Sequence, residues 1–130
     1  MELGNTHTCT CTPNRVYKKS YARASHIVTA SEKDLEARLR KEIEKRGGVA
    51  LKLLSQLHRG LPDRLILMPG GRTYFAEIKT TGKNPTKLQR HCHDQLRRLA
   101  FPVFVIDSWE DLDDVLLTID TEAVNASDPE

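Results

Sequence analysis

The sequence predicts a mixed α/β domain in which helices flank a β-sheet, and three stretches of the chain support this prediction. From about Glu32 to Arg46, leucine or isoleucine recurs every four residues, which is typical of a helix that buries one stripe of side chains. Two apolar runs joined by Pro69-Gly70-Gly71 indicate a β-hairpin. From about Thr86 to Ile119, the patterns of a helix, a strand and a second helix follow one another. We therefore expect the order α-β-β-β-α-β-α.

Size and composition allow one globular domain. The chain has 130 residues, enough for a modest core, with 29% charged and 38% hydrophobic residues. The net charge is only +2, so any nucleic-acid-binding surface would have to come from local clusters of basic residues. No apolar run approaches the length of a membrane span, and the N-terminus lacks the apolar core of a signal peptide. We expect a soluble, intracellular protein with no membrane partner.

The first helix has signals at both ends. Thr29-Ala30-Ser31-Glu32 reads as a capping box, and Gly47-Gly48 should stop the helix. A short, largely buried strand is expected over Val49 to Leu54, with Lys52 inside it. Lys52 either extends its ammonium group into water or lies beside a functional site. The buried stripe of the helix is predicted to be Leu35, Leu39 and Ile43.

The hairpin brings charged residues together at one end. If Pro69, Gly70 and Gly71 form a three-residue loop, counting outward along both strands places Asp63 opposite Glu77. Side chains alternate along a strand, so Glu77 and Lys79 share one face of the sheet with Asp63. Two carboxylates and one lysine therefore converge at the end of an otherwise apolar hairpin.

Two carboxylates so close together repel each other, and a divalent cation would remove that cost. Carboxylate oxygens, completed by water and a phosphate oxygen, suit Mg²⁺ or Mn²⁺. Lys79 could then orient or deprotonate an attacking water. The alternative is that Asp63 is only the polar start of a strand and that Glu77 and Lys79 form a solvated pair.

The second half of the chain continues the α/β pattern. Asn84 is expected to cap a helix that has Pro85 at its first position and runs from Thr86 to Leu99. A buried strand follows over Phe101 to Asp107, and Ser108 begins a last helix. The predicted core face of the Thr86 to Leu99 helix is Leu88, Cys92, Leu96 and Leu99, its basic exposed side is Arg90, His91, His93, Arg97 and Arg98, and the buried stripe of the last helix is Leu112, Val115, Leu116 and Ile119.

Several short motifs follow one another in a recognisable order: Gly47-Gly48, Lys52, Gly60-Leu61-Pro62-Asp63-Arg64, Pro69-Gly70-Gly71, Glu77-Ile78-Lys79, Gly82-Lys83, Pro85 and Leu88-Gln89. Pro62-Asp63 with Glu77-Ile78-Lys79 resembles the PD-(D/E)XK nuclease signature. The whole set resembles the VRR-NUC family of virus-type replication and repair nucleases over about Ser31 to Ile119.

The resemblance implies a restriction-endonuclease-like PD-(D/E)XK core, with a mixed β-sheet flanked by helices, and metal-dependent cleavage of DNA. Small stand-alone members are typical of phages and prophages, and they resemble homodimeric resolvases of branched DNA such as Holliday junctions. We therefore expect DNA and a second copy of the chain as partners, and the cytoplasm of a bacterium or phage-infected host as the location. A DNA-binding module that does not cut, and a nuclease acting on flaps, ends or RNA, are the alternatives.

The resemblance also assigns site residues. Asp63 and Glu77 would bind Mg²⁺ or Mn²⁺ and act in catalysis with Lys79 and Gln89. An acid on the first helix would complete the metal site. Counting back from the helix-ending glycine favours Glu36, while Glu32, one turn earlier, is the competitor. Substrate contacts are expected from Lys52, Arg59, Lys83 and Lys87.

The ends of the chain lie outside the predicted domain. Residues 1–30 read as a poorly ordered basic extension that could contact DNA, wrap a partner subunit or remain a tail, and residues 120–130 as a frayed acidic tail. The odd number of cysteines argues against a disulfide framework. A zinc site combining Cys9 and Cys11 with Cys92 is conceivable, but it lacks the usual ligand spacing.

Overall fold

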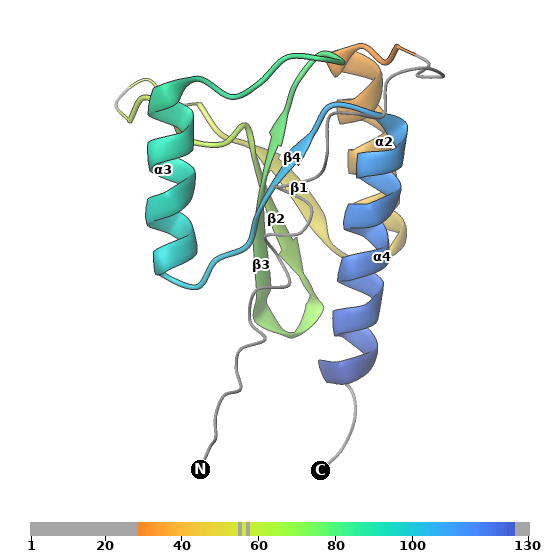
Figure 1. Cartoon of the computed structure of the whole chain (residues 1–130). Helices are drawn as coiled ribbons and strands as arrows, with labels where there is room; N and C mark the ends of the chain where they lie inside the picture. Colours follow the sequence, from red (N-terminus) through yellow and green to blue (C-terminus); the bar gives the residue numbers. More distant parts are fainter. Residues whose placement is uncertain (1–28, 55, 57, 127–130) are drawn as a thin grey trace, which may run out of the picture.

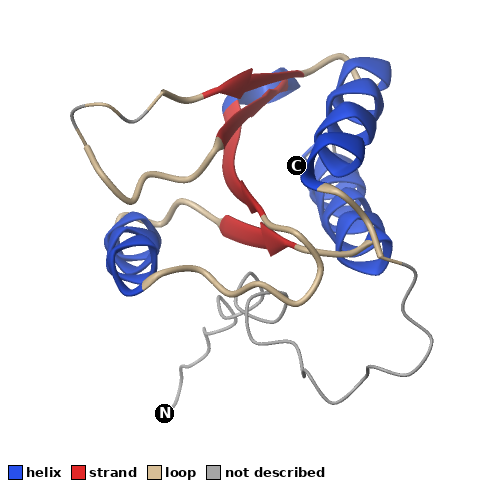
Figure 2. Cartoon of the chain, turned by 90° about the horizontal axis from the view of Figure 1, so that it is seen from above, coloured by secondary structure: helices blue, strands red, loops and turns tan. Residues whose placement is uncertain are grey.

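The computed structural model describes residues 29–54, 56 and 58–126, and every structural statement below concerns these residues. A four-stranded sheet in the order β1-β2-β3-β4 forms the middle layer. Helices α2 and α4 pack together on one face and α3 lies on the other (Figures 1 and 2). The elements are α2 (Glu32–Lys45), β1 (Val49–Lys52), β2 (Arg64–Met68), the turn η2 (Pro69–Gly71), β3 (Arg72–Ile78), α3 (Lys87–Arg98), β4 (Val103–Ile106) and α4 (Trp109–Ala126). The predicted order and the mixed α/β class are confirmed.

The β2–β3 hairpin has the predicted register. Met68 pairs with Arg72 and Arg64 with Ala76 around the three-residue turn. Gly70 and Gly71 have φ values of +86° and +79°, a region that L side chains rarely adopt, so both glycines are needed in so tight a turn. Strand β1 is antiparallel to β2, whereas β4 joins β3 in parallel, which makes the sheet mixed.

The core lies between the sheet and the α2–α4 pair. The predicted stripe of α2 is fully buried there and packs against alternate residues of the strands and against the buried side of α4. Helix α2 ends at Lys45, and Gly47, two residues later, has a φ of +82°. Gly48 packs so closely on β2 that an added Cβ would lie 2.6 Å from the Leu67 carbonyl oxygen. The largest side chains of this core are Leu35, Leu39, Ile43, Ile66, Tyr74, Ile78, Phe104, Ile106, Leu112 and Ile119.

Strand β1 corrects one prediction. It ends at Lys52 and buries only Ala50, while Leu51 is 44% exposed. The reason is its position at one edge of the sheet, whereas α3 contacts β4 at the other edge. An apolar run alone cannot distinguish an edge strand from a central one.

The helix caps differ from the predicted ones. The N-cap of α2 is Ser31, whose hydroxyl accepts from the Asp34 amide at 3.1 Å. The N-cap of α3 is Thr86 rather than Asn84, so Pro85 precedes the helix. Thr86 is the N-cap because Gln89, three residues later, completes a reciprocal capping box with it.

Helix α3 buries a different face from the predicted one. Leu88 and Leu99 are 49% and 67% exposed, Cys92 is half-buried, and the buried residue is His93, which was expected on the outer side. Arg97, also expected outside, instead donates from NH2 to the Val103 carbonyl at 2.8 Å.

Helix α4 extends to Ala126, beyond the expected start of a frayed tail at Asp120. Two contacts hold the part of α4 that begins at Asp120. Arg46 Nε donates to Asp120 Oδ1 at 2.7 Å, and the Tyr74 hydroxyl donates to Glu122 Oε1 at 2.5 Å. Within the described part of the chain, none of the helices has the length and apolarity to span a membrane.

Candidate active site

Glu77 is the centre of a polar cluster on the α3 face of the sheet. It lies near the end of β3 and is 1% exposed. Lys79 Nζ lies 3.2 Å from its Oε2, and Gln89 Nε2 donates to the same oxygen at 2.7 Å. The other end of the Gln89 amide accepts from the Thr86 backbone at 2.8 Å. The capping box of α3 therefore fixes the orientation in which Gln89 holds Glu77.

Asp63 lies just before β2, beside Glu77. Its Oδ2 accepts from the Ile78 amide at 3.1 Å, and its carbonyl accepts from the Leu53 amide at 2.7 Å. Burial raises the pKa of Asp63, and the negative charge of Glu77 raises it further, against the opposing effects of the Ile78 hydrogen bond and Lys79. The hairpin argument is thus confirmed: it brings Asp63, Glu77 and Lys79 together.

Glu36 approaches from the other side of the sheet. Its Oε2 accepts from Arg64 NH2, and Lys52 Nζ lies 3.8 Å away. Arg64 and Lys52 are register partners on β2 and β1, and α2 covers that face. Glu36 therefore lies beside the start of β2, where its carboxylate is paired with the side chains of Arg64 and Lys52.

Glu32, one turn earlier, contacts the segment that follows β3. Its Oε2 accepts from the Thr80 hydroxyl at 3.2 Å, and its charge contributes to the raised pKa of Asp63. The backbone around it is also fastened, because the Ala30 amide donates to Thr81 Oγ1 at 3.1 Å. Of the two helix acids, Glu32 is the one whose charge acts on Asp63, as the smallest of the contributions to its raised pKa.

His93 is the residue that sequence reasoning missed. It is fully buried, and its Nε2 lies 3.8 Å from Glu77 Oε1. Gln89 and His93 are four residues apart, so both project from the same side of α3. That spacing could have indicated the inward position of His93, but the leucine pattern of α3 predicts a different buried face.

The donor set fits a divalent cation. Burial, and after it the negative charge of Glu77, disfavours the ionised form of Asp63 and raises its pKa. The buried Glu77 Oε1 accepts no hydrogen bond from the described residues. Those residues hold no group of three or more His, Cys, Asp or Glu side chains placed for a metal ion. The oxygens of Asp63 and Glu77 would suit Mg²⁺ or Mn²⁺, with water to complete the coordination, and a metal ion at this site remains a prediction.

Comparison with known proteins agrees with this geometry. No protein-family model matches the chain. It is 41% identical over 85 residues to "Putative nuclease p44" of Acyrthosiphon pisum secondary endosymbiont phage 1, covering 65% of this chain and 90% of that protein. A solved structure described as a VRR_NUC domain superposes with a TM-score of 0.63 and 27% identity, covering 67% of this chain and 96% of that chain. This chain belongs to the VRR-NUC nuclease family.

The predicted substrate residues of this VRR-NUC domain are found on β1, before β2, after β3 and at the start of α3. Lys52 contacts Glu36 at the edge of the sheet. Arg59 is exposed in the segment before β2, Lys83 is exposed in the turn after β3, and Lys87 is the exposed first residue of α3. Their contact with DNA remains a prediction. Cys9 and Cys11 lie outside the described residues, so the zinc alternative also remains untested.

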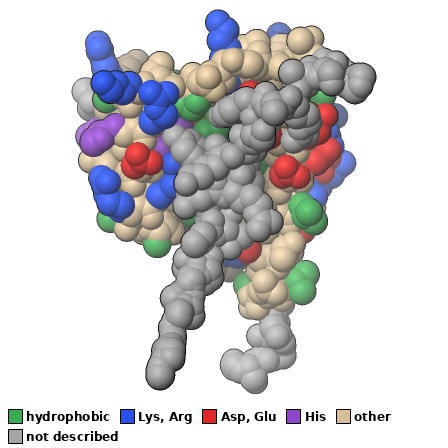
Figure 3. Space-filling view, viewed as in Figure 1, with side chains coloured by type: hydrophobic (Ala, Val, Ile, Leu, Met, Phe, Trp, Pro, Cys, Tyr) green, Lys and Arg blue, Asp and Glu red, His purple; other side chains and the backbone are tan. Residues whose placement is uncertain are grey.

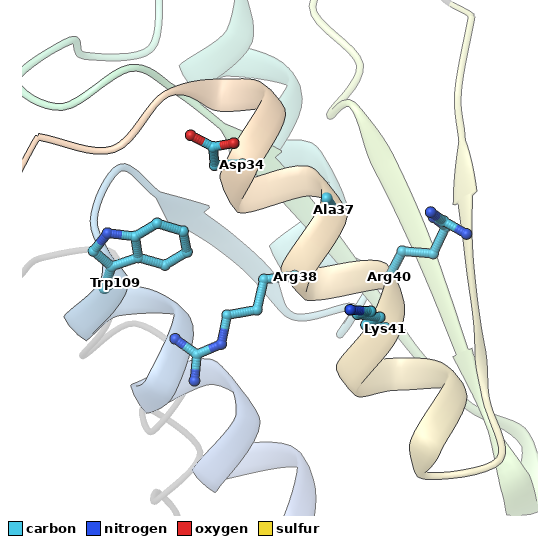
Figure 4. A pocket seen from close by; sticks show the side chains of 6 residues that line it. All are labelled: Asp34, Ala37, Arg38, Arg40, Lys41 and Trp109. Carbon is cyan, nitrogen blue, oxygen red and sulfur yellow. The ribbon is translucent and has the colours of Figure 1, made fainter.

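A hollow of about 380 Å³ lies away from this cluster, between α2 and the start of α4 (Figure 4). Trp109 and Arg38 face each other there, with the guanidinium carbon 5.7 Å from the ring centroid, and Arg38 also pairs with Asp113 at 2.9 Å. Neither Asp63 nor Glu77 lines it. The hollow belongs to the contact between two helices of the VRR-NUC domain and not to the carboxylate site.

Proposed function

We propose that this VRR-NUC protein is a Mg²⁺- or Mn²⁺-dependent PD-(D/E)XK endonuclease that hydrolyses phosphodiester bonds in DNA. The observation that carries the proposal is the Asp63–Glu77 pair with Lys79 beside it. Burial, and after it the charge of Glu77, raises the pKa of Asp63, so ionised Asp63 is unfavourable here and metal binding would offset this cost.

Each side chain has a role in the proposed hydrolysis. Asp63 and Glu77 hold the cation, which supplies stabilisation for the charge that develops on the phosphate. Lys79 orients the attacking water, because its pairing with Glu77 keeps Nζ at the site. Gln89 supports Glu77 through the 2.7 Å hydrogen bond. The water oxygen bonds to phosphorus and gives up a proton to solvent, while the bond from phosphorus to the ester oxygen breaks and that oxygen takes up a proton from solvent.

The distribution of charged side chains supports binding of DNA on the α3 side of the domain. Helix α3 carries Lys87, Arg90 and Arg98 as exposed bases and Asp94 as its one acid. Figure 3 shows Lys and Arg side chains gathered over this side, whereas acidic and basic side chains lie together over the opposite side. A phosphate backbone would be attracted to the first surface more than to the second. Helix α4 has no lysine or arginine, and its acids are Glu110, Asp111, Asp113, Asp114, Asp120 and Glu122.

The test is cleavage of a labelled four-way junction, a flap and a linear duplex, with a matched RNA, in Mg²⁺ and in Mn²⁺. Glu77→Gln keeps the side-chain volume and removes the charge, so cleavage should fall by on the order of 10²-fold or more. Glu110→Ala, an exposed acid on α4, is the matched control and should cut like the parent. Binding without cutting, unchanged by Glu77→Gln, would favour a non-cleaving module.

The same assay also tests which DNA structure is preferred and which acid of α2 completes the metal site. We expect the four-way junction to be cut in preference to the duplex, by a homodimer that presents two sites to a two-fold substrate. Light scattering at cutting concentrations should give the mass of a dimer, and a monomer would defeat this part. Glu36→Gln and Glu32→Gln are compared in the same cleavage assay. The substitution that causes the larger loss of Mn²⁺-dependent cleavage identifies the acid that completes the metal site.

A further inference from the structure

The way α3 packs on the sheet is unusual. Its fully buried residue is His93, while Leu88 and Leu99 remain largely exposed. Burying an imidazole costs more than burying a leucine unless its polar atoms are used. Packing alone would have turned the leucines inward. The position of His93 therefore calls for a polar reason.

The group that His93 faces is the carboxylate of Glu77. Gln89 and Lys79 both engage Oε2 of Glu77, at 2.7 Å and 3.2 Å. The imidazole Nε2 lies on the side of the other oxygen, 3.8 Å from Oε1. The charge of Glu77 also raises the pKa of Cys92, the neighbour of His93, after the larger effect of burial. Helix α3 is thus within the field of Glu77 along this turn.

We propose that His93 is a positioning residue that holds Glu77 from the Oε1 side and so fixes the carboxylate for cation binding. Gln89 and His93 act as a pair from one face of α3, each restraining one oxygen. An imidazole can present an N–H from Nε2 as the neutral tautomer or as the imidazolium, so the role does not depend on a change of charge. The inference rests on the proposed function, since it assigns Glu77 to the metal.

A purely structural role for His93 makes a different prediction. If the ring only fills space, leucine at this position should preserve both folding and metal binding. If the ring positions Glu77, leucine should preserve folding and weaken metal binding, whereas glutamine, which can place an N–H near the position of Nε2, should keep most of it. Removing groups that orient metal ligands typically costs about 10- to 100-fold in affinity.

The experiment is calorimetric titration of the full chain with Mn²⁺ alone, for the parent, His93→Leu, His93→Gln, Glu77→Gln and Leu96→Ala. Leu96 is a half-buried apolar residue of the same helix and offers no hydrogen-bond donor from its side chain, so Leu96→Ala should lower the unfolding temperature and leave Mn²⁺ affinity unchanged. We expect His93→Leu to weaken Mn²⁺ binding by about tenfold or more. His93→Gln should stay close to the parent, and in junction cleavage His93→Leu should lower kcat at an unchanged KM for DNA.

Parent-like Mn²⁺ affinity in His93→Leu, with a clear loss in Glu77→Gln, would overturn the role of His93 and leave the proposed function intact. Equal losses in His93→Leu and Leu96→Ala would also overturn it, because both would then act through folding. If Glu77→Gln itself binds Mn²⁺ like the parent, the metal site and the His93 role fail together. Should His93→Leu not fold, His93→Asn replaces it, since its amide cannot reach the position of Nε2.

Discussion

The two faces of the sheet differ in what they bury. Alternate residues of β3 divide between them: Tyr74, Ala76 and Ile78 face the α2–α4 pair, and Glu77 faces α3. The first face closes over leucine, isoleucine and phenylalanine. The second uses buried space for Glu77 and His93 while leucines of α3 and β1 stay exposed. One face therefore stabilises the domain, and the other gives up some stability to hold a charged site.

The largest effect expected from this comparison is at Leu39, in the middle of the buried stripe of α2. Leu39→Ala should lower the free energy of unfolding by about 2–5 kcal/mol, because a fully buried leucine leaves a cavity. Urea unfolding measures it. Leu88→Ala on α3 is the matched control and should change stability by less than about 0.5 kcal/mol. A loss at Leu88 as large as that at Leu39 would contradict the division between the faces.

Asp63→Asn should act in the opposite direction and more weakly. The raised pKa of Asp63 means that folding disfavours its charged form, so the cost is absent below the ordinary pKa of 3.8 and fully present above the raised one. Without divalent ions, Asp63→Asn should therefore be more stable than the parent at pH 7. The difference should shrink as the pH falls through this window. Urea unfolding of the parent and the variant in the presence of a chelator, at pH 7 and at a pH below 3.8, tests this. A variant that is less stable than the parent at pH 7 would contradict it.

Local sequence patterns predicted the hairpin and the meeting of Asp63, Glu77 and Lys79 at its end. A three-residue turn fixes register, and register alone brings Asp63 to Glu77. The burial of His93 and the exposure of β1 could not be predicted in this way, because they depend on which helix covers which part of the sheet. The same limit applies to Glu36 and Glu32: helical periodicity places both on α2 but does not show which one reaches the end of β3.

The smallest expected effect is at Tyr74, whose hydroxyl donates to Glu122 and accepts from Arg72 NH1 at 3.2 Å. Tyr74→Phe keeps the ring in the core and removes these bonds, so it should cost about 1 kcal/mol at neutral pH. Burial, with the Glu122 hydrogen bond, raises the Tyr74 pKa from 10.0 to about 12. A raised pKa stabilises the fold below pH 10, and this contribution is lost as the pH rises towards 12. The parent and Tyr74→Phe should therefore converge in stability over this range, as measured by unfolding in urea at each pH. Convergence would show that the stabilising face also uses polar bonds, at the last turn of α4, whereas a constant difference would assign the loss to packing alone.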